Sequence, residues 1–360
     1  MRLERVDVLT HRGAVRGVRG AVEAWTERAG LLLRLVTSDG RVGQGEASPL
    51  PRYSADGLDA ARSSLEALEW NAIPQAESGE SIRAYVARLG VLTAALPPSA
   101  AFAVETALLD LVGQERDCPL WALFGGSTPA PVPLSSLVGG ADDDDAPNAA
   151  AKSVGRGIGT VKVKIAGPHL GRQLGTLARI REAIGDGKLR LDANGTFASS
   201  TAFAEIETLA GLDVEFVEEP MAIEALLELQ TLPIPIALDE SLQPSGMFER
   251  LEPFLTRLGC AALVLKPAAL GGFSRCLELA ERGRFRSVEP TVSHLFDGPV
   301  ALAAASHLAL AVASRSLASG LDWHGGLSAW PEVALPFLRP AEIVPPSSPG
   351  LGLAPLPGRP

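Results

Sequence analysis

The chain has 360 residues, enough for a (β/α)₈ barrel of about 250 residues and a second domain of about 110. Hydrophobic residues make up 46% of the chain and charged residues 21%, a globular composition that excludes wholesale disorder. Lys and Arg number 32 against 42 Asp and Glu, and the net charge of −10 argues against nucleic acid as a partner.

The cysteines and the apolar segments indicate the compartment. Cys118, Cys260 and Cys276 lie far apart without a CxxC motif, which fits a reducing cytosol rather than a disulfide framework. The N-terminal stretch lacks an apolar core of signal-peptide length, and the longest apolar run, residues 298–313, is shorter than the ~20 residues that span a membrane. We therefore expect a cytoplasmic protein without a membrane segment.

The first 125 residues predict a small α+β domain. Residues 2–9 alternate apolar and polar side chains as a half-buried strand does, and residues 31–37 and 42–47 flank a Ser-Asp-Gly turn typical of a hairpin. Three helical stretches follow, at residues 54–70 with Ser54 as the cap, 81–89 and 99–112. Strands followed by helices favour one compact capping domain over residues 1–125.

From residue 132 the pattern changes to alternating strands and helices. Eight β-rich segments recur, at residues 132–138, 160–165, 188–192, 214–218, 234–239, 261–266, 285–292 and 317–322. Six helical stretches accompany them, at residues 170–184, 202–210, 222–229, 247–258, 272–282 and 300–314. This order favours an α/β fold with a closed parallel TIM barrel over residues 126–334; an open sheet is the alternative, although no GxGxxG follows the first strand. The Pro- and Gly-rich tail, residues 335–360, is expected to contribute to the capping domain, and the acidic run 142–145 to be a solvated loop.

Ionisable residues stand at the carboxyl ends of five successive predicted strands. In chain order they are Lys162 and Lys164, Asp192, Glu218, Asp239, and Lys266. Each has an ordinary explanation when taken alone, because a Lys-x-Lys pair is usually solvated and a strand-end Asp often caps a helix. Together they would be costly to bury at one end of apolar strands unless they bind something.

The combination predicts a particular chemistry. Three carboxylates from neighbouring strands suit Mg²⁺, which prefers oxygen ligands and keeps positions open for substrate. Two lysines on the inward face of one strand, facing the cation, are candidate bases whose pKa the cation would lower. Proton abstraction next to a carboxylate is the reaction that such a set serves.

These residues resemble the enolase superfamily, muconate-lactonising subgroup. The resemblance rests on Lys162-x-Lys164, Asp192 in LDANG, Glu218 in VEEP, Asp239 in ALDES and Lys266 in LKP. It covers nearly the whole chain, since the N-terminal part is similar to the family's capping domain and PGLGL near the C-terminus to its tail. Residues 45–54, GEASPLPRYS, are similar to a capping-loop stretch of the o-succinylbenzoate synthases of menaquinone biosynthesis.

The resemblance implies a role for each of these residues. Mg²⁺, with Mn²⁺ as a substitute, would be held by Asp192, Glu218 and Asp239. Lys164 would remove the α-proton and protonate the departing hydroxyl, and Lys266 would stabilise the enediolate from across the ring. Lys162 would orient the substrate carboxylate. The implied reaction is syn-dehydration of 2-succinyl-6-hydroxy-2,4-cyclohexadiene-1-carboxylate to 2-succinylbenzoate.

The remaining candidate residues concern substrate contacts. We expect Asn194 to support the metal or its water, and expect contacts with the small-molecule carboxylate substrate from Ser48, Arg52, Tyr53 and His294. Asp297 either replaces a family Glu or, as we favour, caps the following Ala-rich helix. For His294, packing in the core is an equally good explanation. Asp322 and His324, at the end of the eighth strand, either line the pocket or, as we favour, have a structural role.

Several alternatives remain open at this stage. An N-acylamino acid racemase or dipeptide epimerase on the same scaffold needs both Lys164 and Lys266 as bases, and both are present. A muconate-type cycloisomerase is a third candidate, and a non-catalytic metal-binding protein a fourth. An oligomer is compatible with the sequence, which does not fix the number of subunits.

Overall fold

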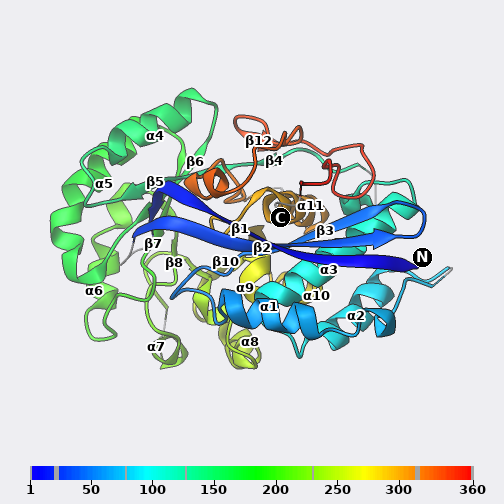
Figure 1. Cartoon of the computed structure of the whole chain (residues 1–360). Coiled ribbons are helices and arrows are strands. Elements are labelled where there is room, and N and C mark those ends of the chain that lie inside the picture. Colours follow the sequence, from blue (N-terminus) through cyan, green and yellow to red (C-terminus); the bar gives the residue numbers. More distant parts are fainter. Residues whose placement is uncertain are drawn as a thin grey trace.

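The structure, a computed structural model, describes residues 2–19, 24–77, 79–125, 128–228, 231–312 and 317–357. A three-stranded antiparallel sheet with three helices forms the N-terminal part, and a curled parallel sheet with helices forms the rest (Figure 1). No helix in these ranges is long and apolar enough to cross a membrane.

The N-terminal sheet has the order β1-β2-β3, with β1 at Leu3–Arg19, β2 at Ala24–Thr37 and β3 at Val42–Ala47. The predicted hairpin is confirmed, with Val36 paired to Val42 beside the turn. Strand β1 runs well beyond the predicted residues 2–9, because its pairing with β2 resumes after an irregularity between Ala14 and Val18. The sequence there is polar, so hydrophobic alternation could not reveal it.

Three helices pack beside this sheet: α1 at Leu58–Ala67, α2 at Ile82–Thr93 and α3 at Pro98–Glu115. Helix α3 is buried along most of its length and lies directly on β3. A Cβ atom on Gly45 would come within 1.9 Å of the Ala103 carbonyl, so glycine is what permits this approach. Ser54 does not cap α1 as predicted; its hydroxyl accepts from the Leu50 amide, and the helix begins after Gly57.

The parallel sheet has the order β11-β10-β9-β8-β7-β6-β5. Its strands are β5 (Ser135–Gly140), β6 (Thr160–Lys164), β7 (Lys188–Asp192), β8 (Val214–Glu218), β9 (Ile236–Leu238), β10 (Cys260–Leu265) and β11 (Glu289–Val292). These seven match predicted strands, and a short β4 (Val132–Pro133) occupies the start of the first predicted one. A curled sheet of this kind, with its helices, is a modified TIM barrel with an N-terminal cap.

The predicted eighth strand, residues 317–322, is not a continuous strand. It forms two isolated parallel bridges instead, Leu134 with Ser319 and Ser293 with Gly320. The Gly320 amide donates to Val292 at 2.8 Å, and the Ser135 amide donates to Ser319 at 2.8 Å. The two edges of the sheet are therefore joined through one segment that is too short to form a regular strand.

The helices around the sheet agree with the predictions in part. They are α5 (Leu170–Ile184), α6 (Ala202–Glu207), α7 (Ile223–Glu228), α8 (Met247–Leu251), α9 (Pro267–Leu270), α10 (Phe273–Phe285) and α11 (Pro299–Val312). Residues 229, 313 and 314 of two predicted helices lie outside the described residues. Helix α4 (Ala146–Gly155) was missed, because the acidic run directly before it was interpreted as part of a solvated loop.

The C-terminal tail returns to the N-terminal part. Strand β12 (Glu342–Ile343) pairs with β4, and the chain then runs to helix α3 and strand β3. The Leu351 amide donates to the buried Asp110 carboxylate at 2.9 Å, and the Leu356 amide donates to Gln44 at 2.7 Å. The tail is thus hydrogen-bonded to residues of the predicted capping domain.

Candidate active site

The residues predicted from the strand ends gather at one end of the parallel sheet. The ladder pairs Lys164 with Asp192 and Asp192 with Glu218 across β6, β7 and β8. Asp239 follows β9 directly, and Lys266 follows β10. Because parallel strands bring their carboxyl ends to the same edge, residues far apart in sequence become neighbours here.

On one side, two lysines reach the carboxylates of β7 and β8. Lys162 Nζ lies 2.6 Å from Glu218 Oε1 and 2.9 Å from Asp192 Oδ2. Lys164 Nζ lies 3.0 Å from the same Asp192 oxygen and donates to Asn194 Oδ1 at 2.9 Å. Both lysines therefore point to the same face of β6, as the alternation predicted.

On the other side, Lys266 contacts Asp239 and Tyr53. Its ammonium donates to Asp239 Oδ2 and, at 2.7 Å, to the Tyr53 hydroxyl, which itself donates to Asp239 Oδ1 at 3.0 Å. The same ammonium lies 4.6 Å from the centre of the Tyr53 ring. Three strands, β7 to β9, separate the strand of Lys164 from that of Lys266, so the two lysines approach the site from different sides.

The carboxylates are buried close together, and their pKa values reflect this. Burial raises the pKa of Glu218 to about 7, with Asp192 and Asp239 adding to the effect and Lys162 opposing it. Burial alone would lower the pKa of Lys162, but the Asp192 and Glu218 carboxylates outweigh it, so the pKa is raised. Glu218 and Asp239 are near enough for a carboxyl–carboxylate hydrogen bond. The three carboxyl groups are thus held close together at one place in the site.

This donor set fits a divalent cation. Within the described ranges no group of His, Cys, Asp or Glu side chains is spaced to enclose a metal as it stands, because lysine ammonium groups lie between the carboxylates. The fit comes from the donor chemistry: three buried carboxylates with shared hydrogen bonds and mutual repulsion supply the hard oxygen ligands that Mg²⁺ prefers. Asp192, Glu218 and Asp239 are the residues that would hold it.

Sequence reasoning missed two residues that orient this set. Glu219 accepts from the Asp239 amide at 2.9 Å and from the Ser241 hydroxyl, fixing the end of β9. Glu240 accepts from Asn194 Nδ2 at 2.8 Å. Glu219 and Asn194 adopt left-handed backbone conformations, with φ of 39° and 42°, which non-glycine residues rarely adopt and which mark functional sites. The doubled acids Glu-Glu and Asp-Glu were the available signal.

A buried polar network fixes the capping loop on the barrel. The Glu46 carboxylate accepts from the Gly298 amide at 2.5 Å and the Ala301 amide at 3.0 Å, at the start of α11, and from the Ser48 hydroxyl at 2.5 Å. These contacts make Glu46 the cap of α11. The predicted cap, Asp297, is wrong in this role, because its Oδ2 accepts from the Leu295 amide instead.

Arg28 completes the network from strand β2. Its guanidinium donates to the Ser48 and Pro49 carbonyls of the capping loop, at 2.7 and 2.9 Å, and to the Leu295 and Phe296 carbonyls of the barrel, at 3.3 and 3.2 Å. One buried side chain thus ties both loops together. Removal of either partner of such a buried hydrogen bond would leave the other partner unpaired, which would destabilise the fold.

The predicted substrate contacts have different surroundings. Tyr53 lies at Lys266, whereas the Ser48 hydroxyl is engaged with Glu46. Arg52 is exposed, with a left-handed backbone φ of 65°. The His294 ring lies against that of His324, with ring centres 3.9 Å apart and an angle of 38° between the planes. Direct contact of any of them with a substrate stays a prediction.

Asp322, at the end of the closing segment, is committed to the protein. It is buried, forms an ion pair with Arg156 that includes a 3.1 Å hydrogen bond, and accepts from the Ser136 hydroxyl at 2.8 Å. This agrees with its structural interpretation. His324, two residues on, has both ring nitrogens buried without a hydrogen-bond partner among the described residues.

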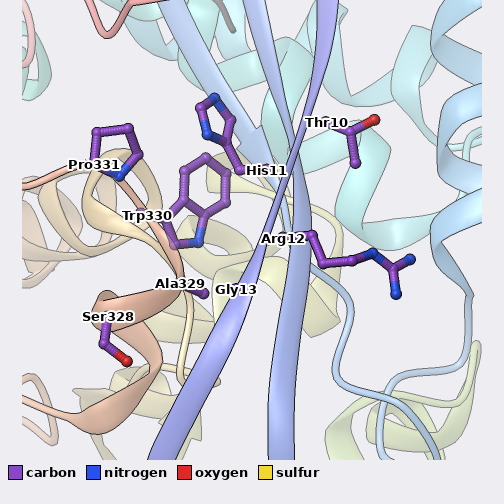
Figure 2. A pocket seen from close by; sticks show the side chains of 8 residues that line it. All are labelled: Thr10, His11, Arg12, Gly13, Ser328, Ala329, Trp330 and Pro331. Atoms are coloured by element: carbon purple, nitrogen blue, oxygen red, sulfur yellow. The ribbon is translucent and has the colours of Figure 1, made fainter.

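A separate pocket of about 500 Å³ lies between β1 and the segment that follows residue 327. Figure 2 shows the His11 and Trp330 side chains together on one side of β1, with Arg12 on the other. The two rings stack with centres 4.8 Å apart, and a Cβ atom on Gly13 would come within 2.8 Å of Ala329. None of the predicted catalytic residues lines this pocket, which follows the seam between the cap and the barrel.

Family comparison agrees with this architecture. Residues 5–125 match the mandelate racemase / muconate lactonizing enzyme N-terminal domain, and residues 145–358 match the enolase C-terminal domain-like family. The chain therefore belongs to the enolase superfamily, in its muconate-lactonising subgroup. This confirms the family that the strand-end residues indicated.

The relatives of known activity fall into several kinds. An N-succinyl-L-Arg/Lys racemase of Bacillus cereus is 24% identical over 71% of this chain and 69% of its own. An o-succinylbenzoate synthase of Pasteurella multocida is 27% identical, covering 87% and 88%. An L-Ala-D/L-Glu epimerase of Bacillus subtilis is 29% identical, covering 78% and 76%.

Among solved structures, a dipeptide epimerase of Enterococcus faecalis in complex with Mg and L-Leu-L-Tyr aligns with a TM-score of 0.83. It covers 98% of this chain and 100% of its own at 22% identity, a likeness in fold alone. Relatives of three activities at similar identity define an enolase-superfamily enzyme that acts on a small molecule, and they leave the particular reaction to be argued from the site.

Proposed function

We propose that the protein is a Mg²⁺-dependent o-succinylbenzoate synthase of menaquinone biosynthesis. The observation that carries this proposal is the position of Lys164 and Lys266 on different sides of three buried carboxylates, beneath a capping loop similar to that of the synthases. When bound to Asp192, Glu218 and Asp239, Mg²⁺ would supply positive charge to the substrate carboxylate.

In this proposal Lys164 does the proton chemistry. Its amine takes the proton from the carbon next to the carboxylate, and the electron pair of that C–H bond moves into an enediolate. The resulting ammonium then gives the proton to the hydroxyl on the same face, the C–O bond breaks, and water leaves as the ring becomes aromatic. Asn194, which accepts from Lys164 at 2.9 Å, holds the ammonium in place between these steps.

The other two lysines stabilise charge. Lys266, held by Asp239 and the Tyr53 hydroxyl, presents its cation to the opposite face of the ring. Lys162, between Asp192 and Glu218, holds the substrate carboxylate in register. Fixed charges in a dry site stabilise a developing oxyanion more than mobile ones do, because no reorganisation is needed.

A direct assay tests the proposal. The cyclohexadiene carboxylate is mixed with the enzyme, with Mg²⁺ or with EDTA, and its ultraviolet absorbance is followed. We expect rapid loss of the substrate band with Mg²⁺ or Mn²⁺ and none with EDTA. A dead reaction with Mg²⁺, in enzyme that binds the metal, would refute the synthase.

A second candidate is a racemase of N-acylamino acids. The observation that favours it is the same pair of lysines, since one base on each face is what inversion of an α-carbon requires. It is tested by incubation of N-succinyl-L-phenylalanine in D₂O. Exchange of the α-proton with inversion, in the absence of dehydratase activity, would replace the synthase by the racemase.

A further inference from the structure

A pair of histidines stands at the end of the sheet beyond Lys266. His294 follows β11, and His324 follows the closing segment. The ladder pairs Val292 with Leu265 of β10, and the next amide, that of Ser293, donates to the Leu265 carbonyl at 2.9 Å. Ser293 therefore stands beside Lys266. His294 is the next residue, at the same end of the sheet as the catalytic set.

The two rings lie in close contact, tilted by 38° to each other. Their centres are 3.9 Å apart, and the Phe296 ring lies 5.2 Å from His294 and 5.8 Å from His324. The Phe296 amide donates to His294 Nδ1 at 3.0 Å. A neutral His294 must then carry its proton on Nε2, which leaves that N–H free to donate. His324 keeps one donor and one acceptor nitrogen without a partner among the described residues.

The charges around this pair are cationic. Burial, and then the nearby His324, Lys266 and Lys162, hold the pKa of His294 well below its usual value. Burial and Arg28 lower the pKa of His324 to about 3. Both rings are thus neutral donors in a positive field, a setting that favours an anion.

The carboxyl groups near this wall do not offset that field. Asp322, two residues before His324, is paired with Arg156 and Ser136. Asp297 is fully buried, burial raises its pKa, and Arg28 lies near enough to counter its charge. Asp297 Oδ1 has no hydrogen-bond partner among the described residues, but both carboxyl groups are buried, so neither is presented to a substrate ammonium.

The order of the strands gives the direction in which a substrate must extend. Its reacting carboxylate belongs at β7 to β9, where Asp192, Glu218 and Asp239 lie. The rest of the molecule then extends toward β11 and the closing segment, where the histidines stand. We infer that His294 and His324 form a distal subsite that receives a second carboxylate of the substrate and so selects succinyl-bearing substrates over dipeptides with a free ammonium.

This inference rests on the proposed function for the place of the reacting carboxylate, and it narrows the substrate class. Both candidate reactions retain it, since a succinyl group ends in a carboxylate in the cyclohexadiene substrate and in N-succinylamino acids. An epimerase of unblocked dipeptides does not fit it. The two histidines follow neighbouring predicted strands, which places them at one edge of the barrel, but the contact between their rings was not visible in the sequence.

The test measures binding of two matched ligands by calorimetry with Mg²⁺ present. 2-Succinylbenzoate carries the distal carboxylate, and 2-butanoylbenzoate has a methyl group in its place. A hydrogen bond to a charged group predicts at least tenfold tighter binding of the succinyl compound, roughly. In His324→Phe, which keeps an aromatic ring against His294 but has no nitrogens, we expect this ratio to fall toward one while binding of 2-butanoylbenzoate is unchanged.

Two further variants provide a second test and a control. His294→Asn keeps an acceptor for the Phe296 amide and loses the ring N–H, and it is expected to lower the ratio as well. His169→Gln, on an exposed histidine, should leave the ratio as in the wild type. Equal affinity of the wild type for both ligands, or an unchanged ratio in both variants, would overturn the inference.

A third comparison separates this inference from the proposed function. N-succinyl-L-phenylalanine is expected to bind more tightly than L-Ala-L-Phe, and the reverse order would overturn the distal subsite. Binding needs no turnover. Failure of the dehydration assay with the ligand ratio intact would therefore remove the synthase and support the subsite, whereas dehydration with a ratio of one would do the opposite.

Discussion

The two halves of the site are built in different ways. The lysine and carboxylate half comes from strands β6 to β10, and each residue reaches its place because its own strand ends there. The outer half is assembled from the capping loop, β2, and the loops after β11 and the closing segment. Each residue of the first half is positioned by its own strand, whereas the residues of the second half are positioned by contacts between the two domains. The first half carries the groups of the proposed reaction, and the second half surrounds the approach to them.

The largest effect is expected in the first half, from Lys164→Ala. Loss of a general base costs about 10²–10⁴-fold in rate, and this lysine acts twice in the proposed reaction. We expect at least a thousandfold lower kcat, roughly, with Mg²⁺ binding and the circular dichroism spectrum unchanged. Lys152→Ala, on an exposed lysine of α4, is the matched control. Substantial residual turnover would remove Lys164 as the base.

Asp239→Asn is expected to weaken Mg²⁺ binding next most strongly. Loss even of an outer-shell partner costs about 10–100-fold in metal affinity, so removal of a charged ligand should cost at least about 100-fold. Calorimetric titration with Mg²⁺ measures it directly, apart from activity. Asp144→Asn changes a fully exposed carboxylate and should leave the affinity unaltered. Unchanged affinity in Asp239→Asn would contradict the assignment of the metal site.

In the outer half, Glu46→Gln is expected to change how stability depends on pH. Burial, and then the neighbouring Asp297, raise the pKa of Glu46 to about 7 from 4.5. Because the folded state holds this proton more tightly, the associated stability is complete below about pH 4.5 and is lost as the pH rises through 7. A shift of this size corresponds to about 3 kcal/mol.

Urea unfolding of the wild type and of Glu46→Gln between pH 4.5 and pH 8 provides the measurement. The free energy of unfolding of the wild type should fall by about 3 kcal/mol more than that of the variant. Other buried acids, such as Asp110, remain in both proteins and cancel in the difference. Parallel curves would show that Glu46 does not titrate in this range.

Tyr53→Phe tests the single point where the two halves meet, and its effect is the smallest. The hydroxyl donates to Asp239 and accepts from Lys266, so its loss should loosen the carboxylate that Mg²⁺ needs. We expect about tenfold weaker Mg²⁺ binding. Tyr85→Phe removes the only other tyrosine hydroxyl of the chain, far from the site in α2, and is the control. Equal effects of the two changes would contradict a specific role.

The sequence alone predicted the first half well, for a physical reason. Side-chain alternation placed Lys162 and Lys164 on one face, and strand ends placed the carboxylates beside them, because both rules act within a few residues. The fold followed from the spacing of strands and helices. Where local signals were weak, prediction failed: the eighth strand reduces to two bridges, and helix α4 was missed.

The second half was out of reach because its contacts join distant parts of the chain. Glu46 caps a helix 255 residues away, and Arg28 reaches a carbonyl 268 residues away. No periodicity connects such positions. Asp297 looked like the cap of α11 only because it stands next to it, and the competing carboxylate from β3 could not be seen in the sequence.

The return of the tail has a consequence for synthesis. The Asp110 carboxylate and the Gln44 side chain receive their amide donors from Leu351 and Leu356, which a ribosome adds more than two hundred residues later. At about 5–20 residues per second, the first domain waits roughly ten to fifty seconds for its last contacts. During that time the Asp110 carboxylate and the Gln44 side chain are hydrated instead of paired with the tail, so the cap acquires its full set of hydrogen bonds only when translation ends.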